Sequence, residues 1–274
     1  MLKTKVIKLP KHKGFTLIEL IIVIIILAIM GISFAKITSN SVYGYIDARD
    51  RNKLSQTAQW VSERISREVR EALPQSVRTG TSGNFHCVEF MPIVNASSYT
   101  NLPASGAISS FQAVGFNLAS NNSSLVAIMP IDSASLYSSV GVLGTVASIA
   151  TSAGDPNQAV ITLDAPTNFL GRSPQNRFYL LNQPVSFCLN NANGQILRYA
   201  NYGVNANQPF PPSNGSIVGE NFSVNGAVFN YQAGTLSRSG LLQVNLRLQN
   251  RDRTLSGSEE SFEVYHEVHI RNVP

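Results

Sequence analysis

The N-terminal quarter of the chain combines a continuous apolar run with an amphipathic pattern. The run from Phe15 to Ala35 has 21 residues, which is long enough for a helix to cross a bilayer. Residues 36–44 are rich in weak helix formers, and helical periodicity resumes from about Ala48. Pro74 is expected to stop the helix. The pattern therefore predicts an N-terminal helix over residues 15–73 with a membrane-spanning part at 15–35.

The amphipathic part of this helix has one apolar face and one charged face. The apolar face consists of residues three or four positions apart: Ala58, Val61, Ile65, Val69 and Ala72. The charged face contains three pairs of opposite charge at i,i+4 spacing: Glu63–Arg67, Arg64–Glu68 and Arg67–Glu71. We expect the apolar face to pack on the rest of the protein. The charged face either contacts another subunit or is a solvated helix surface.

Residues 74–274 have the pattern of a β-rich domain. The expected strands are Phe85–Val94, Phe111–Leu118, Leu125–Met129, Ala159–Leu163, Phe178–Leu189 and Gln195–Tyr199. A hairpin turn is expected from Asn190 to Gly194. The polar stretches Ser133–Gly154 and Asn201–Gly219 are expected to be loops, and the second contains three prolines that a central strand would not hold.

The clearest strand pair lies near the C-terminal end. Apolar and polar residues alternate over 242–249 and again over 262–270, and His266 is the polar exception on the apolar side of the second segment. Such alternation is typical of antiparallel strands with one buried face. The predicted fold class is α+β, with a long N-terminal helix packed on a β-rich antiparallel-sheet C-terminal domain.

A basic leader precedes the apolar run. The first fourteen residues contain five lysines and no acid, and Glu19 is the single charged residue between Phe15 and Ala35. Inserting a charged residue at the centre of a membrane span costs roughly 2.5–3.5 kcal/mol. Because such residues are rare in spans, Glu19 is expected to have a functional role. The run is too long for a signal peptide and no Ala-x-Ala site follows it closely, so we expect cleavage before it. The lysines predict a cytoplasmic N-terminus and a periplasmic C-terminal domain.

Gly14, Phe15 and Glu19, together with the leader and the apolar run, resemble the prepilin signature of type IV pilins and pseudopilins. The resemblance implies a type IV pilin-like fold with a leader at 1–14, an N-terminal helix at 15–73 and a globular domain at 74–274. It also implies that prepilin peptidase cuts between Gly14 and Phe15 and that Phe15 is N-methylated. Glu19 would then form the assembly contact, by pairing with the N-terminal amine of a neighbouring subunit. In this family the helix often loosens near residue 36, commonly around a proline; this chain has Lys36 there, which leaves the loosening open.

A second resemblance involves Arg67–Pro74, Gln75–Arg78 and His86–Ile93. These segments are similar to the large minor pilin of the mannose-sensitive haemagglutinin (MSHA) pilus system and to the J-type minor pseudopilins of type II secretion. The resemblance implies an inner-membrane precursor that joins other major and minor pilins through the inner-membrane pilus assembly machinery. The expected function is the assembly or priming of an MSHA-type type IV pilus, with adhesion as a further role. The alternatives are a J-type pseudopilin and a tip adhesin that binds a surface ligand.

Charge and cysteine content narrow the functional classes. The net charge is +5, but removal of the leader leaves 16 Lys and Arg against 16 Asp and Glu, and residues 79–171 contain no Lys or Arg. Nucleic-acid binding is therefore not implied. Cys87 and Cys188 are expected in the periplasm, where a disulfide between them is favoured over two buried thiols. Closing a loop of this length is worth roughly 4.7 kcal/mol in the chain-entropy model.

No catalytic motif is present in the sequence. His266 and His269 are three positions apart, so on a strand they point to opposite faces and do not share a metal. The segment Asp155–Asn157 lacks the spaced acids of a calcium loop. We expect no enzyme activity, no cofactor and no metal. Three aromatic residues form either an exposed contact surface or part of the packing: Tyr199, Tyr202 and Phe210.

Overall fold

The computed structural model describes residues 14–103, 105–116, 125–235, 238–249 and 261–270. The five leader lysines and most of the segment that joins the two alternating stretches near the C-terminal end, residues 250–261, lie outside these ranges. The chain divides into two compact units, residues 1–52 and residues 53–274, and each unit is described by itself.

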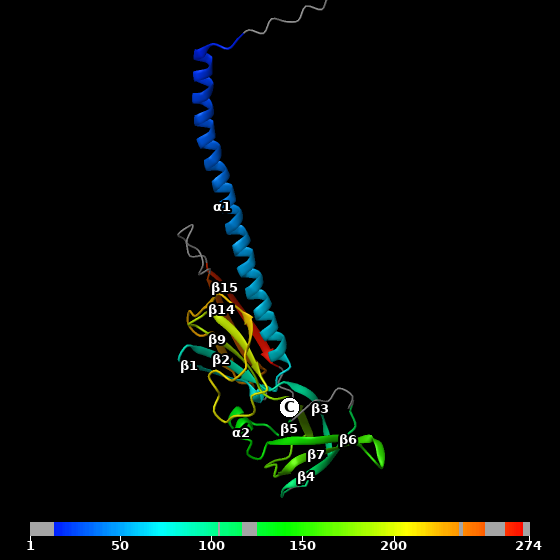
Figure 1. Cartoon of the computed structure of the whole chain (residues 1–274). Helices are drawn as coiled ribbons and strands as arrows, with labels where there is room; N and C mark the ends of the chain where they lie inside the picture. Colours follow the sequence, from blue (N-terminus) through cyan, green and yellow to red (C-terminus); the bar gives the residue numbers. More distant parts are fainter. Residues whose placement is uncertain (1–13, 104, 117–124, 236–237, 250–260, 271–274) are drawn as a thin grey trace, which may run out of the picture. The chain divides into compact units, whose positions relative to one another are not determined.

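A single long helix, α1 (Leu17–Arg70), accounts for the described part of the first unit and continues into the second (Figure 1). The helix is long and apolar enough to cross a membrane. Its large apolar side chains from Leu17 to Tyr45 are exposed. A long N-terminal apolar helix is thus confirmed, with bounds two or three residues inside those predicted.

The stretch of weak helix formers at 36–44 is helical. Thr38 and Ser41 donate their hydroxyl protons to the carbonyl oxygens of Phe34 and Ile37, each over 2.9 Å. Hydroxyl side chains inside a helix commonly bond the carbonyl four residues earlier, so their polar groups are satisfied without leaving the helix. In this chain by itself the helix therefore does not loosen beside Lys36.

The part of α1 in the second unit packs through the predicted apolar face. Ala58, Val61, Ile65 and Val69 are fully buried and Ala72 is 3% exposed. They share one hydrophobic core with strands of two sheets. A short 3-10 helix, η1 (Pro74–Ser76), follows, as Pro74 requires the α-helix to have ended.

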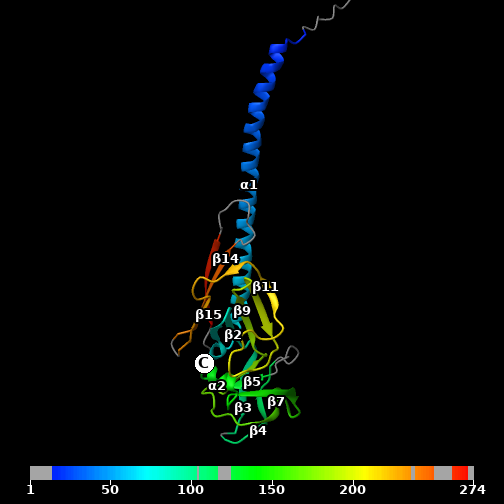
Figure 2. The ribbon, with the colours of Figure 1, turned by 60° about the vertical axis from the view of Figure 1, so that its left-hand side comes forward.

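A five-stranded antiparallel sheet forms one layer against this core (Figure 2). Its strand order is β1-β2-β9-β10-β11, with bounds Arg78–Ser82, Phe85–Phe90, Val185–Asn190, Gln195–Ala200 and Ser216–Gly219. The hairpin between β9 and β10 is confirmed: Gly194 has a φ of +69° and donates its N–H to the carbonyl oxygen of Asn190.

A second antiparallel sheet is built around β14 (Gly240–Gln249). On one edge β14 pairs with β15 (Ser261–Ile270) over its whole length. On the other edge it pairs with β12 (Phe222–Ser223) and β13 (Phe229–Gln232). The alternation predicted for this strand pair is confirmed, because Leu242, Val244, Leu246 and Leu248 are fully buried and their neighbours in β14 are not.

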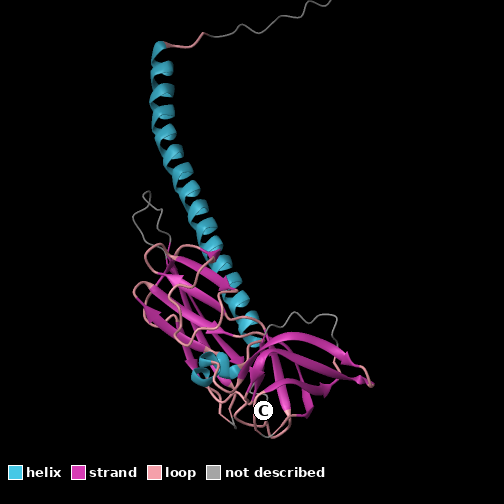
Figure 3. Cartoon of the chain, turned by 60° about the horizontal axis from the view of Figure 1, so that its bottom comes forward, coloured by secondary structure: helices cyan, strands magenta, loops and turns pink. Residues whose placement is uncertain are grey.

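Six strands form a closed antiparallel barrel (Figure 3). They are β3 (Ile93–Asn101), β4 (Ile108–Val114), β5 (Leu125–Ile128), β6 (Leu143–Ser152), β7 (Asp155–Thr167) and β8 (Arg177–Leu181). The barrel has its own core, which includes Phe111 and Phe178 with rings in edge-to-face contact. In sequence the whole barrel lies between β2 and β9, which are neighbours in the five-stranded sheet.

The barrel accounts for the main errors of the sequence prediction. The strand expected at Phe85–Val94 is two strands, β2 and β3, and the one expected at Phe178–Leu189 is β8 and β9. Pro92 and Pro184 lie at the two breaks, where the chain passes between sheet and barrel. The loop expected at Ser133–Gly154 contains α2 (Ser133–Ser138) and β6, and the one at Asn201–Gly219 contains β11. Small residues interrupt the apolar positions of β6, and β11 has only four residues, so neither strand shows a clear apolar pattern.

Candidate functional site

The residues of the expected processing and assembly site lie together at the start of α1. Thr16 caps the helix: its hydroxyl oxygen accepts the N–H of Glu19 over 3.3 Å, and its carbonyl oxygen accepts the N–H of Leu20. Thr16 and Glu19 have the spacing of a capping box. Glu19 lies in the first turn, where the helix dipole favours a negative charge.

The Gly14–Phe15 peptide bond lies before the helix and is accessible. Phe15 is 80% exposed, and no atom of the described residues would obstruct a side chain at Gly14. A peptidase therefore has free access to this bond in the chain by itself. The roles of Gly14, Phe15 and Glu19 remain predictions.

The apolar surface that follows is uncovered. Side chains from Leu17 to Phe34 are exposed around the helix, among them eight isoleucines: Ile18, Ile21, Ile22, Ile24, Ile25, Ile26, Ile29 and Ile32. A contiguous apolar surface of this size marks a lipid or protein contact. A helix satisfies its own backbone hydrogen bonds, so it suits either a bilayer or a bundle of like helices.

Comparison with known families gives one match, at this site. Residues 9–35 match the prokaryotic N-terminal methylation motif. The chain carries a type IV prepilin-like signature. No curated protein and no solved structure matches the chain.

The motif supports a protein of the type IV pilin or pseudopilin-like class. It implies processing by prepilin peptidase and assembly with other pilins, and with the apolar helix it indicates anchoring in a membrane. It also indicates a structural protein. Because the matched segment ends at residue 35, it carries no information about the sheets or the barrel.

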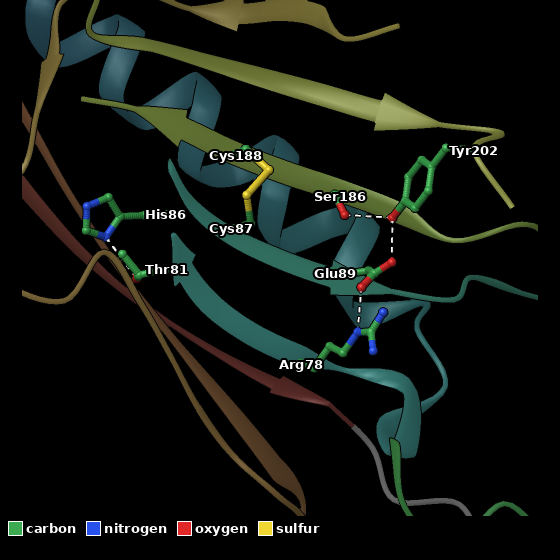
Figure 4. The surroundings of a disulfide bond; sticks show 8 residues. All are labelled: Arg78, Thr81, His86, Cys87, Glu89, Ser186, Cys188 and Tyr202. Atoms are coloured by element: carbon green, nitrogen blue, oxygen red, sulfur yellow. Dashed lines mark hydrogen bonds and ion pairs between the residues drawn. A yellow bond between two sulfur atoms is a disulfide. The ribbon is translucent and has the colours of Figure 1, made fainter. Parts of the chain in front are cut away.

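The two cysteines lie opposite each other on neighbouring strands. Cys87 of β2 and Cys188 of β9 are register partners with Cα atoms 4.1 Å apart, and a disulfide joins them (Figure 4). This agrees with the pairing favoured from the sequence. Tyr199, Tyr202 and Phe210 pack around the disulfide, so of the two interpretations of these aromatic residues the packing role is correct.

A buried carboxylate near the disulfide was missed by the sequence analysis. Glu89 is 0% exposed, and its two oxygens bond different partners. Arg78 on β1 donates its Nε–H to Oε2 over 2.5 Å, and Tyr202 donates its hydroxyl proton to Oε1 over 2.8 Å (Figure 4). The hydroxyl of Ser186 lies 2.6 Å from that of Tyr202. An acid inside the apolar strand Phe85–Phe90 is a usable signal, although the sequence does not reveal its partners.

Arg78 extends this network to the segments beyond the sheet. Its two terminal nitrogens donate to the carbonyl oxygens of Ala206 and Asn205, over 2.7 and 2.8 Å. Its guanidinium stacks 3.6 Å from the ring centre of Tyr137, which belongs to α2 in the barrel segment. Arg78 thus connects the five-stranded sheet, the loop after β10 and the barrel segment.

The surroundings hold the tyrosines of the network in their neutral form. Burial, and next the negative charge of Glu89, raise the pKa of the Tyr202 hydroxyl above its usual value of 10. The same two causes, in the same order, raise the pKa of Tyr137. A neutral Tyr202 keeps the proton that it donates to Glu89, so the network is stable at neutral pH.

The charged face of α1 is partly an internal contact. Glu68 accepts a hydrogen bond from Nε of Arg198 on β10 over 2.8 Å, and Arg64 lies 3.4 Å from the same carboxylate. The predicted Arg64–Glu68 pair is therefore present. At Glu68 the charged face therefore joins the helix to the five-stranded sheet.

The described residues contain no group of three or more His, Cys, Asp or Glu that could hold a metal ion. His266 is half-buried and His269 is exposed, in agreement with their predicted placement on opposite faces of a strand. Asp155 uses its carboxylate within its own turn, where it accepts hydrogen bonds from the N–H of Asn157 and the side-chain amide of Gln158.

Proposed function

We propose that this protein is a minor pilin that takes part in the assembly or priming of an MSHA-type type IV pilus. The observation that carries the proposal is the methylation motif, which covers the start of a helix with an uncovered apolar surface. Residues 1–14 are the leader, prepilin peptidase cuts after Gly14, and Phe15 becomes the methylated N-terminus. The protein first spans the inner membrane, with the leader in the cytoplasm and residues 74–274 in the periplasm.

Assembly brings two charges of neighbouring subunits together. The new amine of Phe15 is a cation and Glu19 is an anion, and both enter a medium of low dielectric constant. Unpaired, each would cost several kcal/mol, so pairing between subunits offsets that cost and fixes the axial position of one subunit on the next. The partners are other major and minor pilins and the inner-membrane assembly machinery.

Two tests address separately whether the protein is a processed pilin and whether it primes pilus assembly. Mass spectrometry of the mature protein tests processing: N-methyl-Phe15 is expected as the first residue, and a start after Ala35 would contradict a pilin. Counting surface pili in a deletion strain tests the role, because loss of a priming subunit abolishes pili. A J-type pseudopilin would instead be required for protein secretion, with pili unchanged.

The inserted barrel favours a tip adhesin as the second candidate. A closed six-stranded module inserted between two paired sheet strands adds surface without interrupting the sheet. Because Phe90 and Val185 are register partners, a two-residue Asn-Gly turn between them would remove the barrel and retain the β2–β9 pair. If this variant restores pili in the deletion strain but not attachment, the barrel acts in adhesion; if it restores both, the barrel has no adhesive role.

A further inference from the structure

A polar groove lies between the second half of α1 and strand β15. It has a volume of about 480 Å³, and both walls belong to the unit formed by residues 53–274. The helix contributes Glu63, Arg67 and Arg70 among other residues, and β15 contributes Val264 and His266. Nothing in the proposed function uses this groove.

The helix wall of the groove carries unpaired positive charge. Within the described residues neither Arg67 nor Arg70 has a hydrogen-bond or ion-pair partner, and both are exposed. In contrast, Arg64 of the helix and Arg198 of β10 both bond Glu68, which lies on the helix outside the groove. The groove lining has one acid, Glu63, against these two arginines. An anionic group in the groove would therefore find two free guanidinium donors.

The strand wall is an incompletely covered sheet edge. Among the described residues β15 has one strand partner, β14, which pairs with all ten of its residues through one edge. The inward side chains of β14 are fully buried, whereas Phe262, Val264 and His266 of β15 are half-buried. A ten-residue edge with free N–H and C=O groups is a template for pairing with another chain.

We propose that α1 and β15 together receive an extended acidic segment of a partner protein. The segment adds to the free edge of β15 as a further strand. Its inward apolar side chains cover Val264, and its inward carboxylates reach Arg67 and Arg70. Main-chain hydrogen bonds supply affinity in this mode of recognition, and the alternate side chains supply specificity. The unpartnered edge of β15 favours a polypeptide, because only a main chain can pair with it. Arg67 and Arg70 favour a segment that carries acidic side chains. The inference goes beyond the proposed function and stands without it.

The test uses the mature full-length protein in detergent micelles and a synthetic nonapeptide, Thr-Val-Thr-Glu-Thr-Val-Thr-Glu-Thr. Alternation places its valines and glutamates on one face of the strand. At about 1 mM peptide, we expect slower amide hydrogen exchange in β15. Two control peptides carry either Lys in place of Glu or N-methylated backbone amides along one edge, and neither is expected to slow exchange.

Matched variants test the helix wall. Arg67→Glu and Arg70→Glu are each expected to weaken peptide binding about tenfold, because they reverse a charge in the groove. Lys53→Glu makes the same charge change at an exposed position of α1 outside the groove and is expected to leave binding unchanged. The inference is overturned if β15 exchange is unaltered, if the Lys peptide binds equally well, or if the two groove variants bind like Lys53→Glu.

Discussion

Cys87 and Cys188 are 101 positions apart in the sequence and are directly paired in the structure. The chain leaves the sheet shortly after Cys87, forms the whole six-stranded barrel, and returns shortly before Cys188. The disulfide therefore joins the two strands, β2 and β9, between which the barrel is inserted. It fixes the sheet independently of what the inserted segment does.

Removal of this disulfide is expected to destabilise the fold. Cys87→Ser combined with Cys188→Ser should cost about 2–5 kcal/mol, because the unfolded chain regains the freedom of a long loop. For a unit of this size, each kcal/mol lowers Tm by about 2–4 °C. Thermal unfolding followed by circular dichroism measures the change. As a control, thiol labelling of denatured, unreduced wild-type protein should find no free thiol; two labelled cysteines would contradict the disulfide.

Neutralising the buried carboxylate of Glu89 is expected to lower the free energy of unfolding by about as much as removing the disulfide. Glu89→Gln leaves Arg78 largely buried without its counter-charge, and breaking a buried pair in this way typically costs about 3–5 kcal/mol. Tyr202→Phe removes one hydrogen bond to the same carboxylate and should cost less, about 1.5–3 kcal/mol for a bond to a charged group. Urea unfolding of the two variants gives the comparison. Equal losses would show that the ion pair does not dominate the network.

The network also predicts a loss of stability at alkaline pH. The pKa of Tyr202 is raised in the folded protein, so above pH 10 the unfolded chain loses this proton more readily than the folded one. Its contribution to stability is complete below pH 10 and declines as pH rises above that value. Tyr202→Phe should therefore reduce the slope of the free energy of unfolding against pH in this range. The slope will not vanish, because Tyr137 has its pKa raised in the same direction.

Glu19→Ala is expected to be inserted and cleaved but poorly assembled. Insertion survives because the segment becomes more apolar, and cleavage survives because the peptidase site is centred on Gly14. Incorporation falls because the amine of a neighbouring subunit loses its partner. The ratio of mature protein in sheared pili to that in the membrane measures the effect. Glu19→Asp keeps the charge but has a shorter side chain, so its ratio should lie between those of the wild type and Glu19→Ala. Incorporation of Glu19→Ala at the wild-type level would exclude this contact.

The sequence by itself determined the features that depend on local periodicity. The apolar run, the buried face from Ala58 to Ala72 and the alternation in β14 and β15 are visible because the period of 3.6 or 2 places like residues on one face. The motif at Gly14, Phe15 and Glu19 is equally local, and its residues occupy one helix start. These parts could be predicted because their evidence lies within a few turns or one strand.

Only the tertiary structure decided how distant segments pair. No local pattern shows that β2 and β9 are neighbours, that the intervening strands close into a barrel, or that Tyr202 lies beside Glu89. The barrel strands β3, β4 and β6 are rich in Ser, Thr and Ala, so their pairing depends on contacts around the barrel rather than on intrinsic preference. That β15 has an unpartnered edge, and Arg67 and Arg70 no ion-pair partner, among the described residues likewise depends on which segments lie beside them. A sequence names the donors and acceptors, whereas the fold determines which of them remain without a partner.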